Sequence, residues 1–145
     1  MTPFSKKLFY AIEAVLYIAY NASTEPVSSK EIAAKQGMPP RYLEQMMQKL
    51  VRAGILRGMR GPHGGYLLAR EKRRITLSDI CKALNEEKNI PASTPLGNQI
   101  VVPMIRKLQA MLAEHMQQTT IADLYEQATE RHIRKSLGER NDFNI

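Results

Sequence analysis

Residues 40–66 constrain the fold of this chain more than any other stretch. Apolar residues first recur there every three or four positions, which is the spacing of a helix with one buried face. A short apolar run, Ile55-Leu56, starts a predicted strand over residues 55–59, and its predicted partner covers residues 66–69. Between them lies a glycine-rich tip, Arg60-Gly61-Pro62-His63-Gly64-Gly65. Glycine permits the positive φ angles of a tight hairpin tip. The order helix, strand, tip, strand predicts a DNA-reading helix followed by a β-hairpin wing.

A second, shorter helix and a tight turn are predicted just upstream. Ser28 and Glu31 have the spacing of a capping box, which starts a helix that reaches Gln36. Gly37 supplies a left-handed stop, and the Pro39-Pro40 pair opens the next helix, where proline costs no hydrogen bond. Two short helices around such a turn form a helix-turn-helix, whose second helix enters the major groove. Any two-helix bundle can use the same turn, so the motif alone leaves both interpretations open.

The remaining sequence predicts helices before and after this unit. Apolar residues recur at helical spacing over residues 4–20 and 100–117, and capping boxes at Thr76 and Thr120 start helices to about residues 84 and 135. The tail from Gly138 is polar and is expected to fray. The expected fold is mostly α with a small β-hairpin. It has three parts: a winged helix-turn-helix domain (1–84), a loop (85–98), and a dimerisation helix with a C-terminal helix (99–145).

The net charge of +7 lies in one half of the chain. Residues 1–80 contain 13 lysines and arginines against 6 aspartates and glutamates, whereas residues 81–145 contain 8 of each kind. A basic half that includes the reading helix and the tip is the footprint expected for phosphate contacts. Charge alone would equally fit a solvated basic surface.

The candidate DNA-binding residues follow from this placement. Glutamine can pair with adenine, glutamate can accept from cytosine, and arginine can bind guanine or phosphate. Arg60 at the tip is suited to a minor groove, and His63 to a phosphate, since no second metal ligand has a workable spacing. The predicted set is Ser5, Lys6, Ser28, Pro40, Arg41, Tyr42, Glu44, Gln45, Lys49, Arg52, Arg60, Gly61, Pro62, His63, Gly64 and Gly65.

Composition bears on the compartment. The chain has one cysteine, Cys81, so it has no intrachain disulfide framework, which suits a reducing cytoplasm. No run approaches the ~20 apolar residues that cross a bilayer, and Glu13 interrupts the N-terminal apolar run, so neither a membrane span nor a signal peptide is expected. The expected location is the cytoplasm, at the nucleoid. Cys81 shares an apolar face with Leu77, Ile80 and Leu84, so it is expected in the core, with a redox sensor as the alternative.

The long helix over residues 100–117 follows a completed winged-helix core. It has little left to pack on within its own chain, and pairing with the same helix of a second copy is the economical solution. Such a two-fold homodimer would present two reading heads to a palindromic site. Folding back on the first helix is a compatible alternative. The predicted interface residues are Met104, Leu108, Met111, Leu112 and His115.

Several segments together resemble the IscR-like family of winged helix-turn-helix regulators, which also includes the NsrR and CymR types. The matching residues are Ser5-Lys6, Tyr42-Leu43-Glu44-Gln45, Ala53-Gly54-Ile55-Leu56, Arg60-Gly61-Pro62-His63-Gly64-Gly65-Tyr66, Ile75-Thr76-Leu77-Ser78-Asp79 and Thr120-Ile121-Ala122-Asp123-Leu124. The resemblance implies a bacterial, homodimeric transcription factor that binds double-stranded DNA and is most often a repressor. It also implies that Glu44 tunes base preference and that the segment from Arg60 to Gly65 is a minor-groove wing.

Many members of that family carry an iron–sulfur cluster held by three cysteines in the loop before the long helix. Here residues 86–98 contain no cysteine, and Val102 stands where a histidine ligand would sit. A single thiol cannot replace three thiolates. We therefore expect no cluster and no other cofactor, and a signal sensed through a small-molecule ligand, a partner protein or the Cys81 thiol.

Two other functional classes were weighed. A protein-interaction module could keep the winged fold and dock a partner enzyme through residues 85–98 and the long helix. An enzyme is not expected, because His63, His115 and His132 are far apart in sequence and no carboxylate pair or phosphate cradle is apparent.

Overall fold

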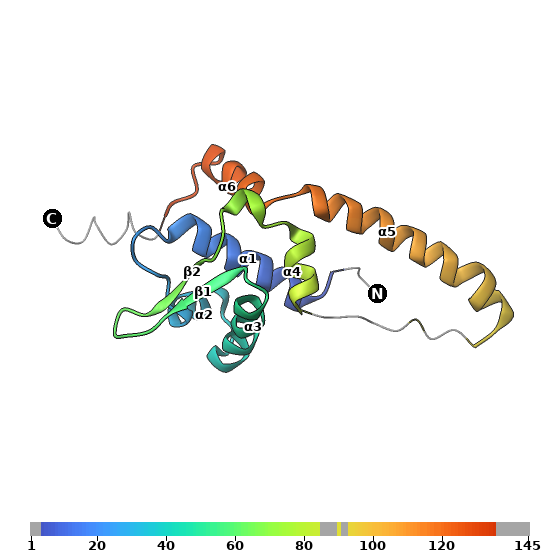
Figure 1. The fold of residues 1–145 in the computed structure, drawn as a ribbon, viewed down its shortest axis with the longest axis horizontal. Helices are drawn as coiled ribbons and strands as arrows, with labels where there is room; N and C mark the ends of the chain where they lie inside the picture. The colour runs from blue at the N-terminus through green and yellow to red at the C-terminus, as the bar shows by residue number, and fades with distance from the viewer. Residues whose placement is uncertain (1–3, 85–89, 91–92, 136–145) are drawn as a thin grey trace.

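The computed structural model describes residues 4–84, 90 and 93–135. In chain order the elements are α1 (Lys6–Asn21), α2 (Ser29–Gln36), α3 (Pro40–Arg52), β1 (Leu56–Met59), β2 (Gly65–Leu68), the 3-10 turn η1 (Lys72–Arg74), α4 (Leu77–Leu84), the π-helical turn η2 (Gly97–Val101), α5 (Val102–Gln118) and α6 (Ile121–Glu130). Figure 1 shows a body made of α1–α4, the hairpin and α6, from which α5 projects. The expected fold class, mostly α with a small hairpin, is confirmed.

Helix α1 runs through the middle of the body and carries much of the core. The Ser5 hydroxyl accepts the N–H of Leu8 and caps the helix. Helix α1 contacts α2, α4, α6 and β2. Its buried residues recur at helical spacing and include Ala11, Ala14, Val15 and Ile18, which are fully buried.

The helix-turn-helix forms as its sequence predicts. Gly37 ends α2 with a φ of 65°, which is the left-handed region. Pro40 is the first residue of α3, where its missing N–H costs nothing. The apolar stripe of α3 is buried and fixes the rotation of the helix about its axis; it consists of Leu43, Met46, Met47 and Leu50.

The hairpin is joined to the helix-turn-helix through its outer strand. Strands β1 and β2 pair antiparallel, from Leu56 opposite Leu68 to Met59 opposite Gly65. The other edge of β2 pairs with Val27: the Val27 N–H donates to the Tyr66 carbonyl at 3.0 Å, and the Tyr66 N–H donates back at 2.8 Å. Val27 immediately precedes Ser28, the N-cap of α2. The wing and the start of α2 therefore share one backbone ladder.

Helices α4 and α6 begin side by side. Thr76 and Asp79 form a reciprocal capping box for α4, and Thr120 and Asp123 form one for α6. The segments around Thr76 and Thr120 pair antiparallel, with the Ile121 N–H donating to the Ile75 carbonyl at 2.8 Å. This pairing returns α6 to the body and anchors the C-terminal end of α5, leaving the other end of α5 to project (Figure 1).

Two helix boundaries differ from expectation. The long helix is already helical at Pro95, where the Thr94 hydroxyl accepts the N–H of Gly97 at 3.0 Å, so the loop expected over residues 85–98 ends earlier. The π-helical turn precedes Pro103, which has no N–H to donate to the preceding turn. Helix α6 ends at Glu130 rather than near residue 135. The chain turns at His132, with a φ of 54°, and the Ile133 N–H donates to the Ala128 carbonyl at 3.2 Å. The tail from residue 138 lies outside the described residues.

The expected burial of Cys81 is wrong, because this residue is exposed on α4. Ser78 is buried instead, alongside Ile80 and Leu84. Helix α4 contacts α1, α3 and α5, so its buried surface is not the single stripe that apolar spacing suggested.

Candidate nucleic-acid interface

The polar face of α3 is exposed to solvent over most of its length. The five residues expected to enter a groove, Pro40, Arg41, Tyr42, Glu44 and Gln45, are all exposed. They lie on the N-terminal half of the helix, opposite the buried stripe that holds α3 on the body. Farther along the same helix Arg52 is exposed and Lys49 is half-buried. The arrangement suits base contacts near the start of the helix and phosphate contacts near its end.

Two exposed residues of this region were missed by the sequence-based set. Gln48 lies three positions after Gln45 on the exposed side of α3, and Arg57 is exposed on β1. The helical period could have identified Gln48, which lies off the buried stripe of α3. Arg57 follows the buried Leu56, but the rest of β1 is exposed, so alternation does not single it out.

The tip of the wing is a tight turn. Gly61 has a φ of 121°, and the Gly64 N–H donates to the Gly61 carbonyl at 2.9 Å, with Pro62 and His63 between them. Arg60, Gly61, Pro62 and His63 are all exposed. A narrow exposed tip with an arginine at its entry has the shape and charge for a minor groove.

Gly65 allows the wing to approach α2. A Cβ atom at this position would lie 2.5 Å from the Val27 carbonyl carbon and 2.9 Å from the Ser28 nitrogen, both backbone atoms. A side chain therefore has no room where β2 passes Val27. The backbone pair of Val27 and Tyr66 can form only because Gly65 has no side chain, and it fixes the direction of the wing relative to the helix-turn-helix.

The base of the wing is also linked electrostatically to α3. Burial raises the pKa of the Tyr66 hydroxyl, and the negative charge of Glu44 raises it further. Tyr66 is therefore neutral at neutral pH and can still donate a hydrogen bond.

The two serines in the predicted set are helix caps. The Ser28 hydroxyl accepts the Glu31 N–H at 3.2 Å at the start of α2, next to the base of the wing. Ser5 caps α1 at the end far from the chain segment that leads to α2, and the exposed Lys6 follows it. The structure thus brings Ser28 together with the wing, but places Ser5 and Lys6 at the other end of α1.

A row of exposed apolar residues, the α5 stripe, lies outside this interface. It consists of Leu96, Ile100, Met104, Leu108 and Met111. Met104, Leu108 and Met111 are 54%, 58% and 60% exposed, values far above those of core residues. Of the other predicted interface residues, His115 is exposed and Leu112 is half-buried. Leu96 was missed because the helix begins earlier than expected, whereas Ile100 was at the start of the expected helix and was not included in the predicted set.

Among the described residues, no group of three or more His, Cys, Asp or Glu side chains could hold a metal ion. No helix in the same part of the chain has the length and apolar character needed to cross a membrane.

Known proteins share both the sequence and the fold. Residues 4–127 match the Rrf2 family, described as "Iron-dependent Transcriptional regulator". Protein rrf2 of Nitratidesulfovibrio vulgaris is 34% identical over 144 residues, 94% of this chain and 91% of that protein. The structure of T. potens IscR has a TM-score of 0.74 and 31% identity, covering 92% of this chain and 93% of the other. CymR, the global cysteine regulator of B. subtilis, has a TM-score of 0.69 and 28% identity, covering 87% and 98%.

The family match spans the helix-turn-helix, the wing, α5 and most of α6. It agrees with the resemblance carried by the reading helix and the glycine tip. The chain belongs to the Rrf2 family, a family of winged helix-turn-helix transcriptional regulators and not of enzymes.

Proposed function

We propose that this regulator is a repressor that binds a palindromic operator as a homodimer, in the cytoplasm. The proposal is supported above all by the fixed placement of the wing relative to α3. The exposed face of α3 and the exposed Arg60 tip are held in fixed relation by the Val27–Tyr66 backbone pair. A rigid pair of reading elements can address a major groove and the neighbouring minor groove at once.

In this proposal the residues have two kinds of role. Arg41, Glu44 and Gln45 read base edges in the major groove, where each good bidentate contact discriminates by roughly 1–3 kcal/mol. Lys49 and Arg52 neutralise phosphates, and Arg60 enters the minor groove. The N–H groups at the start of α2, behind Ser28, suit a phosphate because a helix N-terminus carries partial positive charge.

The α5 stripe supports the homodimer. Exposed contiguous apolar surface on a projecting helix marks an interaction site. A copy of the same helix offers a surface of the same length and character, and two-fold pairing is the commonest way to close such an interface. The two reading heads would then contact half-sites about one helical turn apart.

We also propose that the protein holds no iron–sulfur cluster. The donor set supports this: the chain has a single thiol, and it lies on α4. Residues 86–98 offer no thiolate, and cluster ligation requires about four ligands. The regulatory signal is then a small molecule, a partner protein or a change at Cys81. Cys81 was expected to be buried, which argued against a reactive thiol. Its exposure removes that argument.

Selection of bacterial genomic fragments by the pure protein tests the DNA-reading role. We expect sequence-selective retention that weakens as salt rises, because phosphate contacts release counterions. Gln45→Ala and Arg60→Ala should each weaken operator binding about 5–150-fold, which corresponds to ~1–3 kcal/mol. Lys107→Ala, on the exposed surface of α5, is the matched control and should bind normally. If both reading variants also preserve gene regulation in cells, the protein acts through partner docking and not through DNA.

A further inference from the structure

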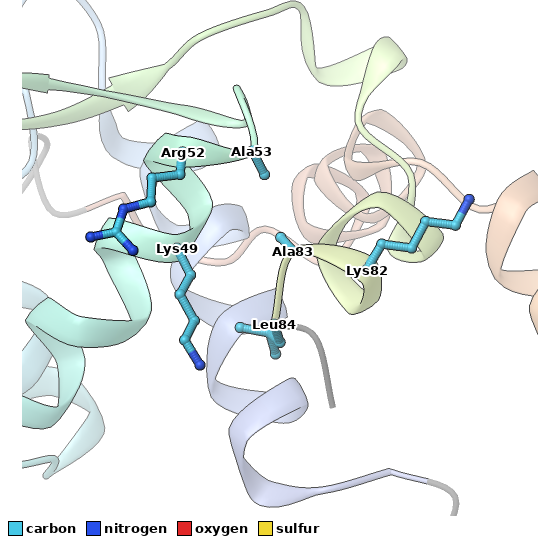
Figure 2. Close-up of a pocket in the computed structure, with 6 residues that line it drawn as sticks. All are labelled: Lys49, Arg52, Ala53, Lys82, Ala83 and Leu84. Atoms are coloured by element: carbon cyan, nitrogen blue, oxygen red, sulfur yellow. The ribbon is translucent and has the colours of Figure 1, made fainter. Parts of the chain in front are cut away.

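A hollow of about 510 Å³ lies between the last turns of α3 and α4 (Figure 2). It is lined by Lys49, Arg52, Ala53, Lys82, Ala83 and Leu84. Leu84 is buried and Ala83 half-buried, so the floor is apolar while the rim carries three cations. Its volume falls within the range of small-molecule sites.

The three cations of the rim have no anionic partner among the described residues. The ion pairs and hydrogen bonds of the described residues do not include Lys49, Arg52 or Lys82, and none of the described residues that line the hollow has a carboxylate. The C-terminal ends of α3 and α4 contribute negative partial charge, roughly half a charge each. Three full positive charges exceed this, so the described residues that line the hollow carry a positive surplus.

The side chains are placed around the hollow rather than packed across it. Figure 2 shows Lys49 hanging beside Leu84 between the two helices, with Arg52 and Lys82 extending outward on opposite sides. Both Arg52 and Lys82 are exposed, so their long side chains can change rotamer without unpacking the core. An entering anion would draw the charged groups inward, and its apolar part would cover Ala53, Ala83 and Leu84.

We propose that this hollow binds a small organic anion, with a carboxylate or phosphate ester group on an apolar body. The apolar floor favours such a ligand over a DNA phosphate, which has no apolar part to cover Leu84. The effect of this anion on DNA binding rests on the proposed function, in which Lys49 and Arg52 of α3 also contact DNA phosphates. An anion held there competes with DNA for them, so it weakens operator binding. Lys82 belongs to the anion site alone.

The test uses octanoate and hexyl phosphate as probes, with octylammonium as the charge-reversed control. In ¹H–¹⁵N spectra of the full chain, both anions should shift the amide signals of Ala53, Ala83 and Leu84, and octylammonium should not. Lys82→Ala should weaken anion binding about tenfold, the loss of one charge-assisted contact. Lys107→Ala, on α5, should leave the affinity unchanged.

DNA binding, measured without any anion, separates this proposal from the proposed function. Lys82→Ala should then bind DNA as the wild type does. If it instead weakens DNA binding and lowers the salt slope by about one, Lys82 contacts a DNA phosphate and the small-anion proposal is overturned. Absence of shifts with both anions also overturns it, whatever the DNA result. If the anions shift these amide signals but the protein retains no DNA fragment, the anion site is supported and the operator-binding function is contradicted.

Discussion

At the scale of single residues, the contact between Gly65 and Val27 determines where the wing points. The Tyr66 backbone pairs with Val27 in both directions, and a Cβ at Gly65 would overlap the Val27 backbone. Neither backbone segment can move aside without breaking this pair. The orientation of the DNA-reading elements therefore depends on the absence of one methyl group.

Gly65→Ala should destabilise the protein by about 1–3 kcal/mol, the usual cost of overpacking, and should weaken operator binding as well. Urea unfolding measures the first effect and fragment retention the second. Gly58→Ala is the matched control, because its Cβ would meet only the Tyr66 ring, at an ordinary 3.9 Å. We expect the control to change the free energy of unfolding by less than ~0.5 kcal/mol. Equal effects of the two variants would contradict the role assigned to Gly65.

A second residue-scale feature ties the end of α6 to α1. The Lys135 ammonium donates to the Tyr125 hydroxyl at 2.9 Å, and the Lys72 ammonium lies 4.1 Å from the centre of the Tyr125 ring. Tyr20 packs edge-on against Tyr125, and its hydroxyl donates to the Ile133 carbonyl. The hydrogen bond from Lys135 lowers the pKa of Tyr125 below the usual 10.0.

This lowered pKa makes a contribution to stability that depends on alkaline pH. The folded state favours the Tyr125 phenolate, so the contribution is absent below the folded pKa and is complete only above the unfolded value near 10.0. Ultraviolet absorbance titration should lose its earliest tyrosine ionisation in Tyr125→Phe. Tyr66→Phe should instead remove a late ionisation, because burial raises that pKa. An unchanged early phase in Tyr125→Phe would contradict the assignment.

At the scale of elements, α5 is anchored at one end and exposed along the rest. Met116 is buried in the core, whereas the α5 stripe points away from it. A helix held in this way needs a partner for its apolar side. Leu112 packs against the core and Val102 and Ile105 are half-buried, whereas Met104, Leu108 and Met111 stay exposed among the described residues. The stripe and not the whole helix is therefore the expected interface.

If the proposed homodimer forms through the α5 stripe, Leu108→Glu should convert it to a monomer in analytical ultracentrifugation, because the change places a charge in the centre of the proposed apolar interface. Gln109→Glu adds the same charge on a different side of α5 and should leave the dimer intact. The fold of the monomer should persist, since Leu108 is not part of the core. A dimer that tolerates Leu108→Glu would mean that the copies associate through another surface.

The elements themselves could be largely predicted from local sequence signals. Capping residues at Ser28, Thr76 and Thr120, and the glycine at position 37, act within one turn of chain and appear where expected. The pairing of Val27 with Tyr66 joins backbones far apart in sequence, and the glycine it requires at position 65 is also explained by the tight hairpin tip, so the sequence does not single out the pairing. The turn at His132 places a non-glycine residue at positive φ, which composition does not signal.

The exposed surface that we propose binds DNA could be predicted from the sequence as a helix face, but its exposure was predicted less well for individual residues. The stripe of α3 correctly identified its exposed side, since one buried face fixes the opposite one. The same reasoning was wrong for Cys81, which is exposed. Helix α4 packs against three helices and buries Ser78, so its buried surface does not follow the apolar stripe. The place of Lys82 at the hollow could not be predicted from the sequence, because the hollow exists only once α3 and α4 are packed together.

At the scale of the whole molecule, the proposal requires a regulator that works without iron. Anaerobic reconstitution with iron and sulfide should give a protein without the visible absorbance of a cluster, and iron chelators should leave operator binding unchanged. The physical reason is the single thiol of the chain. Stoichiometric iron and sulfide bound to the purified protein would contradict it.

Hydroxyl-radical footprinting of a selected operator tests the reading-head arrangement most directly. We expect two symmetric protected half-sites about 10 base pairs apart, each with a minor-groove segment that Arg60→Ala exposes while the major-groove contacts remain. This result would place α3 and the wing on DNA in the fixed relation set by Val27 and Tyr66. A single asymmetric footprint, or a footprint that Arg60→Ala leaves unchanged, would contradict it.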